Sequence, residues 1–148
     1  MPQTLGPGDA EDAAALHARC FPDPWSVSAF REAFGDCAAR AYGFREGGAL
    51  VAFALTKEVA GEADLLTIAT DPAVRRRGLA AELVGALIVE LEAAGLSRLT
   101  LEVAEDNLAA RGLYARFGFA EDGRRPRYYV AGRDVPVDAV LMSRRLGV

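Results

Sequence analysis

Apolar side chains recur with a helical period in four parts of the chain. The strongest pattern lies between residues 77 and 94, where Leu79, Leu83, Leu87 and Leu91 are four residues apart, and it predicts a long amphipathic helix. Similar spacings after a capping residue or before a glycine predict three shorter helices. These helices are expected from Asp9 to about Arg19, from Ser26 to Gly35 and from Asn107 to about Phe117.

Shorter apolar segments bounded by turn residues predict the strands. They are expected at residues 3–5, 40–45, 49–57, 63–70, 99–103, 127–131 and 137–145. The segments between 40 and 70 are joined by short turns, as in antiparallel hairpins, whereas the strand–helix–strand unit from 65 to 103 requires a parallel pair. This order predicts an α/β (α+β) fold, with one mixed, mostly antiparallel twisted sheet flanked by about four helices. We expect a single domain over residues 1–148.

Composition and charge narrow the class of protein. The 17 Lys+Arg and 21 Asp+Glu residues give a net charge of −4, which argues against a protein that coats nucleic acid or an anionic membrane. Neither a signal peptide nor a membrane-spanning apolar stretch is recognisable, so we expect a cytoplasmic protein. Cys20 and Cys37 are too few for a disulfide framework and are expected to be free, buried thiols. The only histidine, His17, has no partner at metal-ligand spacing and is expected to be structural.

Arginine supplies 16 of the 17 basic residues. Three of them, Arg75, Arg76 and Arg77, lie between an apolar strand and the long helix, which begins with the small residues Gly78 and Ala80. A helix N-terminus carries unpaired N–H groups and a partial positive charge. The segment therefore predicts a cradle for a phosphate or pyrophosphate group. From its own residues alone, however, this segment fits a solvated turn slightly better than a phosphate cradle.

Two motifs together resemble the GCN5-related N-acetyltransferase (GNAT) family. Arg75-x-x-Gly78-x-Ala80 is similar to the acetyl-CoA signature of that family. Asn107-x-x-Ala110-x-x-x-Tyr114-x-x-x-Gly118-Phe119 is similar to its second cofactor segment. The resemblance covers essentially the whole chain. It implies a GNAT-like domain that uses acetyl-CoA and no metal, with the parallel strands splayed at the cofactor site.

The resemblance implies cofactor contacts in both motifs and at the end of the preceding strand. The implied residues are Ile68, Ala69, Thr70, Arg75, Arg76, Arg77, Gly78, Leu79, Ala80, Ala81, Asn107 and Tyr114. Asn107 is expected both to cap its helix and to face the pantetheine arm.

Three further segments are similar to RimI-type members of the family, which acetylate the N-terminal alanine of a small-subunit ribosomal protein. These segments are residues 21–26, 125–129 and 138–142. The implied partner is the N-terminus of a ribosomal protein, and we expect a monomer or weak dimer. Two alternatives stay open: an acetyltransferase for a free amino acid or other small amine, and a non-catalytic acyl-CoA-binding module.

The resemblance also implies two catalytic residues. Glu102, between apolar neighbours in a strand, matches the proposed general base, and Tyr114 matches the tyrosine thought to protonate the departing CoA thiolate. A base is useful because an α-amine, with a reference pKa of about 8, is partly protonated at neutral pH. From the residues alone, Glu102 is a solvent-facing carboxylate or the partner of an arginine, and Tyr114 packs in the core.

Aromatic residues on loops are the candidates for substrate binding. Trp25, Tyr128 and Tyr129 are implied to line a peptide groove, although Trp25 fits a core position equally well. A second group of arginines, which we expect to border the substrate entrance, consists of Arg124, Arg125, Arg127 and Arg133. Three roles stay open for Arg125 and Arg127: binding the cofactor 3′-phosphate, steering the substrate, or only solvating a hairpin.

Overall fold

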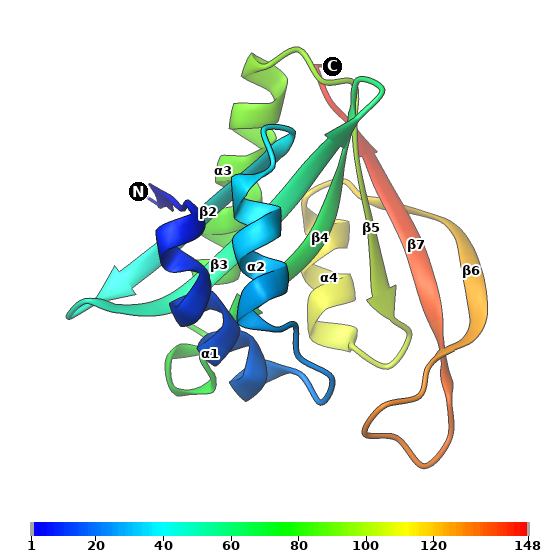
Figure 1. Cartoon of the computed structure of the whole chain (residues 1–148). Coiled ribbons are helices and arrows are strands. Elements are labelled where there is room, and N and C mark those ends of the chain that lie inside the picture. The colour runs from blue at the N-terminus through cyan, green and yellow to red at the C-terminus, as the bar shows by residue number, and fades with distance from the viewer. Residues whose placement is uncertain (1, 148) are drawn as a thin grey trace.

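Seven strands form one twisted sheet in the computed structural model, which describes residues 2–147 (Figure 1). The strands are β1 (Gln3–Thr4), β2 (Ala39–Glu46), β3 (Ala49–Val59), β4 (Glu62–Thr70), β5 (Arg98–Ala104), β6 (Ala120–Tyr129) and β7 (Val137–Arg145). Their order in the sheet is β1-β2-β3-β4-β5-β7-β6. The pair β4–β5 is parallel and the other neighbouring pairs are antiparallel, which confirms the mixed, mostly antiparallel sheet.

The α-helices cover both faces of this sheet. α1 (Ala10–Cys20) and α2 (Val27–Gly35) lie on one face, and α3 (Leu79–Ala93) and α4 (Leu108–Arg116) lie on the other (Figure 1). Short 3-10 helices at Pro7–Asp9 and Pro72–Val74 precede α1 and α3. Within residues 2–147, no helix has the length and apolar character needed to cross a bilayer.

Side-chain caps set the starts of two helices. Oγ of Ser26 accepts a hydrogen bond from the N–H of Ala29 at 3.0 Å, and Oδ1 of Asn107 accepts one from the N–H of Ala110 at 3.2 Å. Both predicted caps are confirmed. Asp9 precedes α1 as predicted, but its carboxylate accepts from the N–H of Gly6 at 2.9 Å and not from the helix.

α3 begins at Leu79, two residues later than the leucine pattern predicted. Arg76 and Gly78 adopt left-handed backbone conformations, with φ of 69° and 78°, which a right-handed helix cannot contain. Gly78 accepts this conformation because it has no Cβ. The loop therefore turns sharply and presents the N–H groups of the first turn of α3. The predicted end at Gly95 is confirmed by its φ of 80°.

β6 extends from Ala120 to Tyr129, so the strand predicted at 127–131 is placed too late. β6 is the edge of the sheet and pairs with β7 on one side. Most of its side chains are exposed, so no alternation of apolar and polar residues marks it in the sequence. Pro126 inside it is consistent with an edge position, where no ladder hydrogen bond is lost.

Two hydrophobic clusters on opposite faces of the sheet show where the odd-numbered side chains of β4 change from one face to the other. Leu65 belongs to the cluster of α3 and α4, whereas Ala69 belongs to the cluster of α1 and α2. Between them, a shift in the β3–β4 register leaves Leu66 without a partner on β3. The parallel pairing ends at the same place, with Leu65 opposite Leu101. Beyond this point β4 and β5 diverge (Figure 1), which confirms the expected splay.

Candidate active site

A cleft of about 770 Å³ opens where β4 and β5 diverge. Its walls come from α1 on one face of the sheet and from α4 on the other. The lining brings together seven residues that the sequence singled out: Trp25, Ile68, Glu102, Asn107, Tyr114, Tyr128 and Tyr129. It does not include Ala69, Thr70, Arg75, Arg76, Arg77, Gly78, Leu79, Ala80 or Ala81, which lie along the end of β4, the following loop and the start of α3.

Glu102 faces the cleft because its neighbours in β5 face the core. Leu101 and Val103 are buried against α3 and α4, so the alternation of the strand turns Glu102 to the opposite side. Its side chain is 31% exposed, and Oε1 lies 3.0 Å from Nη2 of Arg125. The guanidinium of Arg125 in turn lies 5.0 Å from the ring centroid of Tyr128. Of the two alternatives expected from the residues alone, Glu102 is the partner of an arginine.

Tyr114 belongs to both the core and the cleft. It is 4% exposed and packs against Phe119, with 5.6 Å between ring centroids. Burial raises the pKa of Tyr114 to about 12, and the nearby Tyr129 adds to the rise. The phenol therefore keeps its proton at physiological pH and is available as a hydrogen-bond donor. The expected core packing is confirmed, and the residue also lines the cleft.

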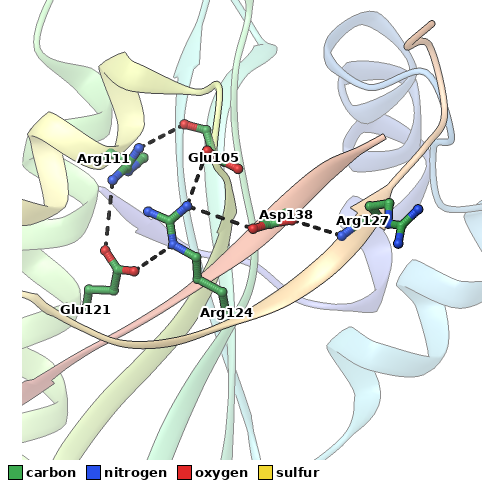
Figure 2. Close-up of polar contacts among 6 residues, drawn as sticks. All are labelled: Glu105, Arg111, Glu121, Arg124, Arg127 and Asp138. Carbon is green, nitrogen blue, oxygen red and sulfur yellow. Dashed lines mark hydrogen bonds and ion pairs between the residues drawn. The ribbon is translucent and has the colours of Figure 1, made fainter. Parts of the chain in front are cut away.

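Tyr128 and Tyr129 reach the cleft through an irregularity in β6. The register with β7 shifts between Arg125 and Tyr129, and Arg127 within it has a φ of 50°. The N–H of Arg127 donates to Oδ1 of Asp138 at 3.0 Å, as Figure 2 shows. This contact holds the bulged backbone next to the tyrosines. Burial raises the pKa of Tyr129, and the negative charge of Glu102 beside it contributes to the rise.

Arg124 fixes the other side of the same strand. Its guanidinium lies 2.8 Å from Glu121 and 3.3 Å from Glu105, and 3.9 Å from Asp138 (Figure 2). Glu105 follows β5, so this network connects the edge strand to the loop that leads into α4. Of the second arginine group, Arg124 is thus structural, and Arg125 contacts the proposed base.

Arg133 and Asp106 form a site contact that the sequence did not single out. Nε and Nη2 of Arg133 lie 3.1 and 3.0 Å from the two carboxylate oxygens of Asp106, and this pairing lowers the pKa of Asp106. The guanidinium also lies 5.6 Å from the ring centroid of Tyr129 and lines the cleft. The contact joins the loop before α4 to the loop after β6. No local pattern could reveal it, because 27 residues separate the partners.

His17 and Cys20 also line the cleft, although the sequence analysis placed neither there. Nδ1 of His17 accepts the N–H of Trp25 at 3.1 Å, and Nε2 lies 3.0 Å from Oγ1 of Thr67. Burial lowers the pKa of His17 to about 4, so the ring is neutral at physiological pH. Cys20 is half-buried and donates to the carbonyl of Thr70 at 3.3 Å, and burial raises the pKa of its thiol. Both cysteines are free, but Cys37 is exposed and the expectation of two buried thiols is wrong.

The N-terminus of α3 leaves backbone N–H groups without a partner inside the helix. Because the first intrahelical hydrogen bond runs from Glu82 to Gly78, the N–H groups of residues 79–81 have no partner within the helix. Arg77 makes two contacts with Glu46, at 2.7 and 2.9 Å, and Arg75 donates to the Thr70 carbonyl at 3.3 Å. Two of the three arginines are therefore engaged within the protein. Within the described residues, no group of three or more His, Cys, Asp or Glu side chains could hold a metal ion.

Known proteins are similar to this chain in sequence and in fold over nearly its whole length. A family model described as the acetyltransferase (GNAT) family matches residues 10–119. The chain is 38% identical over 139 residues to the ribosomal protein bS18-alanine N-acetyltransferase of Escherichia coli, covering 91% of this chain and 90% of that protein. It is 37% identical over 156 residues to the N-alpha-acetyltransferase RimI of Mycobacterium tuberculosis, covering 99% and 94%. The crystal structure of the ribosomal-protein-S18-alanine N-acetyltransferase from Escherichia coli matches with a TM-score of 0.93 and 34% identity, covering 100% of this chain and 94% of that one.

Proposed function

The chain belongs to the acetyltransferase (GNAT) family, and we propose on that basis that it acetylates the N-terminal α-amine of a ribosomal protein that begins with alanine. The observation that carries this proposal is the site itself: Glu102 and Tyr114 line one cleft between the diverging strands, with an aromatic wall beside them. The similarity to two N-terminal acetyltransferases over nine-tenths or more of the chain supports it. Because ribosomal proteins are made in the cytoplasm, we place the enzyme there.

The residues along β4 and α3 fit acetyl-CoA. The N–H groups at the start of α3 suit its pyrophosphate, and the left-handed Gly78 leaves the approach open because no Cβ projects there. Ile68, Ala69 and Thr70 lie in the part of β4 that has no partner on β5, so backbone groups that face away from β3 there can meet the pantetheine arm. The Thr70 carbonyl is the exception, because it accepts from Cys20 and Arg75. Acetyl-CoA supplies the acetyl group as a thioester. Arg76 adds positive charge beside the pyrophosphate position.

Glu102 is the proposed general base. A protonated α-amine cannot attack, and with a reference pKa of about 8 most of the amine is protonated at pH 7. Glu102 takes the ammonium proton, directly or through a water molecule, and the neutral nitrogen then attacks the acetyl carbon. Arg125 at 3.0 Å keeps the carboxylate oriented into the cleft.

Tyr114 is the proposed partner of the departing sulfur. As the carbon–sulfur bond breaks, the phenol donates its hydrogen bond to the developing thiolate. With the pKa of Tyr114 at about 12, complete proton transfer to a thiolate of reference pKa about 8.5 costs roughly 5 kcal/mol. Hydrogen-bond donation therefore dominates, and the proton released by the amine finally resides on the thiol.

Direct attack is favoured over an acetylated enzyme. Cys20 is the thiol in the cleft, but burial raises its pKa and its proton is donated to the Thr70 carbonyl. A thiol in this state is a poor nucleophile, since the thiolate is the reactive form.

A substrate panel tests the proposed function. Purified protein is incubated with acetyl-CoA and either Ala-starting peptides of ribosomal-protein sequence, the same peptides with a blocked N-terminus, free amino acids or polyamines. We expect thiol release with the unblocked peptides and none with the blocked ones. Turnover confined to free amines would overturn the protein substrate in favour of a small-amine acetyltransferase.

A further inference from the structure

His17 connects three segments that meet at the cleft. It lies in α1 and is 3% exposed, and both of its ring nitrogens are hydrogen-bonded, one to the backbone of Trp25 and one to the side chain of Thr67. Since Nδ1 accepts the N–H of Trp25, the neutral ring carries its proton on Nε2 and donates it to Thr67. His17, Trp25 and Thr67 all line the cleft.

Packing alone does not account for a histidine at this position. Its ring centroid lies 4.3 Å from that of Phe21, 5.2 Å from Phe30 and 6.5 Å from Phe53. Among these rings an imidazole loses the hydration of two nitrogens, and the two hydrogen bonds only offset that loss. A phenylalanine would fill the space without this cost. The histidine instead contributes two directional hydrogen bonds, which hold the Trp25 backbone in a fixed position relative to the Thr67 side chain.

We propose that His17 is a positioning residue for the side of the cleft that receives the substrate amine, an inference that rests on the acetyl transfer proposed above. Trp25 belongs to the loop between α1 and α2, which forms one wall. Thr67 follows the unpaired Leu66, at the point where β4 leaves β5. His17 therefore sets the separation between the peptide-binding loop and the strand along which the acetyl group is presented.

The fluorescence of Trp25 reports on this contact without any need for activity, because it is the only tryptophan in the chain. In His17→Phe and in Thr67→Val, we expect acrylamide to quench Trp25 more efficiently than in the wild type. In Thr67→Val we also expect the KM for an Ala-starting peptide to rise about 3- to 10-fold, the range of one lost hydrogen bond. The rise should be at least as large in His17→Phe, which loses both hydrogen bonds of the ring, and the KM for acetyl-CoA should be unchanged in both variants. His17→Gln, which keeps a donor near the position of Nε2, is expected to recover part of the loss.

Thr56→Val is the matched control. Thr56 is a buried strand threonine whose hydroxyl also donates one hydrogen bond, to the Arg40 carbonyl at 3.3 Å, but it does not line the cleft. We expect it to lower stability and to leave both Trp25 quenching and the peptide KM unchanged. The double variant His17→Phe/Thr67→Val should have the same peptide KM and Trp25 quenching as His17→Phe, because His17→Phe already removes the hydrogen bond that Thr67→Val removes.

Two results would overturn the role of His17. One is unchanged Trp25 quenching in both His17→Phe and Thr67→Val, and the other is increased quenching with an unchanged peptide KM. Failure of the proposed function is separate, since it shows as absence of peptide turnover by the wild type. In that case the quenching comparison still decides whether His17 holds the loop.

Discussion

Single residues decide the proton chemistry of the cleft, and Glu102 is the central one. Replacing it by glutamine keeps its size and an oxygen that can face Arg125, but it removes the base and the charge of the ion pair. We expect Glu102→Gln to lower kcat by about 10²- to 10⁴-fold near pH 7, with little change in the KM for acetyl-CoA. Glu105→Gln, beyond the end of the same strand and paired with Arg124, serves as the control and should keep most of the activity. Full activity of Glu102→Gln at neutral pH would exclude Glu102 as the base.

His17 makes the stability of the protein depend on pH. Its pKa is lowered by burial from 6.5 to about 4, so between these values the unfolded chain binds a proton that the folded chain does not. Stability is therefore complete above about pH 7 and is lost as the pH falls toward 4. From pH 7.5 to pH 5 the free energy of unfolding should fall by about 2 kcal/mol through this group alone.

Urea unfolding at the two pH values, for the wild type and for His17→Phe, measures this contribution. In His17→Phe, most of the difference in the free energy of unfolding between the two pH values should disappear. Carboxyl groups whose pKa is lowered by hydrogen bonds and ion pairs, such as Asp71, act mainly below this window. An equal pH dependence in both proteins would show that His17 is not a buried neutral group.

At the scale of elements, the bulge of β6 directs the substrate tyrosines. Asp138 holds it through the N–H of Arg127, so Asp138→Ala should release the segment and raise the KM for an Ala-starting peptide by about 3- to 10-fold, with the KM for acetyl-CoA unchanged. Asp138→Asn keeps an acceptor and should behave nearly as the wild type. Glu121→Ala removes only ion pairs of Arg124 and Arg111 and is the control. Equal effects on both substrates would contradict a role in positioning the peptide side.

The helix α4 contains one residue that is not optimised for stability. A Cβ added at Gly112 meets nothing within 4 Å, and the helical backbone there suits alanine. Gly112→Ala should therefore raise the free energy of unfolding by about 0.5–1 kcal/mol, measured as a higher midpoint in urea. Gly43→Ala gives the opposite sign, because its Cβ would lie 2.9 Å from the carbonyl oxygen of Ala52. A loss of stability in Gly112→Ala would show that the turn packs more closely than described.

These elements also show which features of the fold can be predicted from the sequence. α3 and the caps Ser26 and Asn107 were predictable because their signals are local: leucine spacing and a side chain that satisfies nearby N–H groups. The start of β6 was not predictable, because most side chains of this edge strand are exposed and no alternation of apolar and polar residues marks it. The two-residue delay of α3 follows from the left-handed Gly78 inside the predicted helix, because a glycine permits that conformation but does not by itself predict it.

The candidate site was predicted where two motifs mark it and missed where tertiary contacts build it. Glu102 and Tyr114 came from the family resemblance, and the structure places both in the cleft, although their roles await experiment. The pair formed by His17 and Thr67 spans 50 residues, and no spacing rule connects the partners. Glu102 and Arg125 are also too far apart in the sequence for a local pattern to reveal their contact.

At the scale of the whole molecule, we propose that different elements hold the two substrates. The start of α3 and the α4 side would bind the cofactor, and α1, the Trp25 loop and the end of β6 would bind the acceptor. The arginines near the site are largely engaged in ion pairs, such as Arg77 with Glu46 and Arg133 with Asp106. The net charge of −4 does not reveal this local pairing. Because these arginines are paired, we expect the cofactor phosphates to be bound mainly by backbone N–H groups.

The central claim is that this cleft acetylates a protein α-amine, and locating the acetyl group on a product peptide tests it most directly. A ribosomal-protein peptide that begins with alanine and contains an internal lysine is incubated with the enzyme and acetyl-CoA, and fragment masses then locate the modification. We predict a single acetyl group on the α-amine of the alanine, with none on the lysine and none on a peptide blocked at its N-terminus. Acetylation of the lysine side chain, or an unmodified peptide under conditions where a free amine is acetylated, would contradict the account.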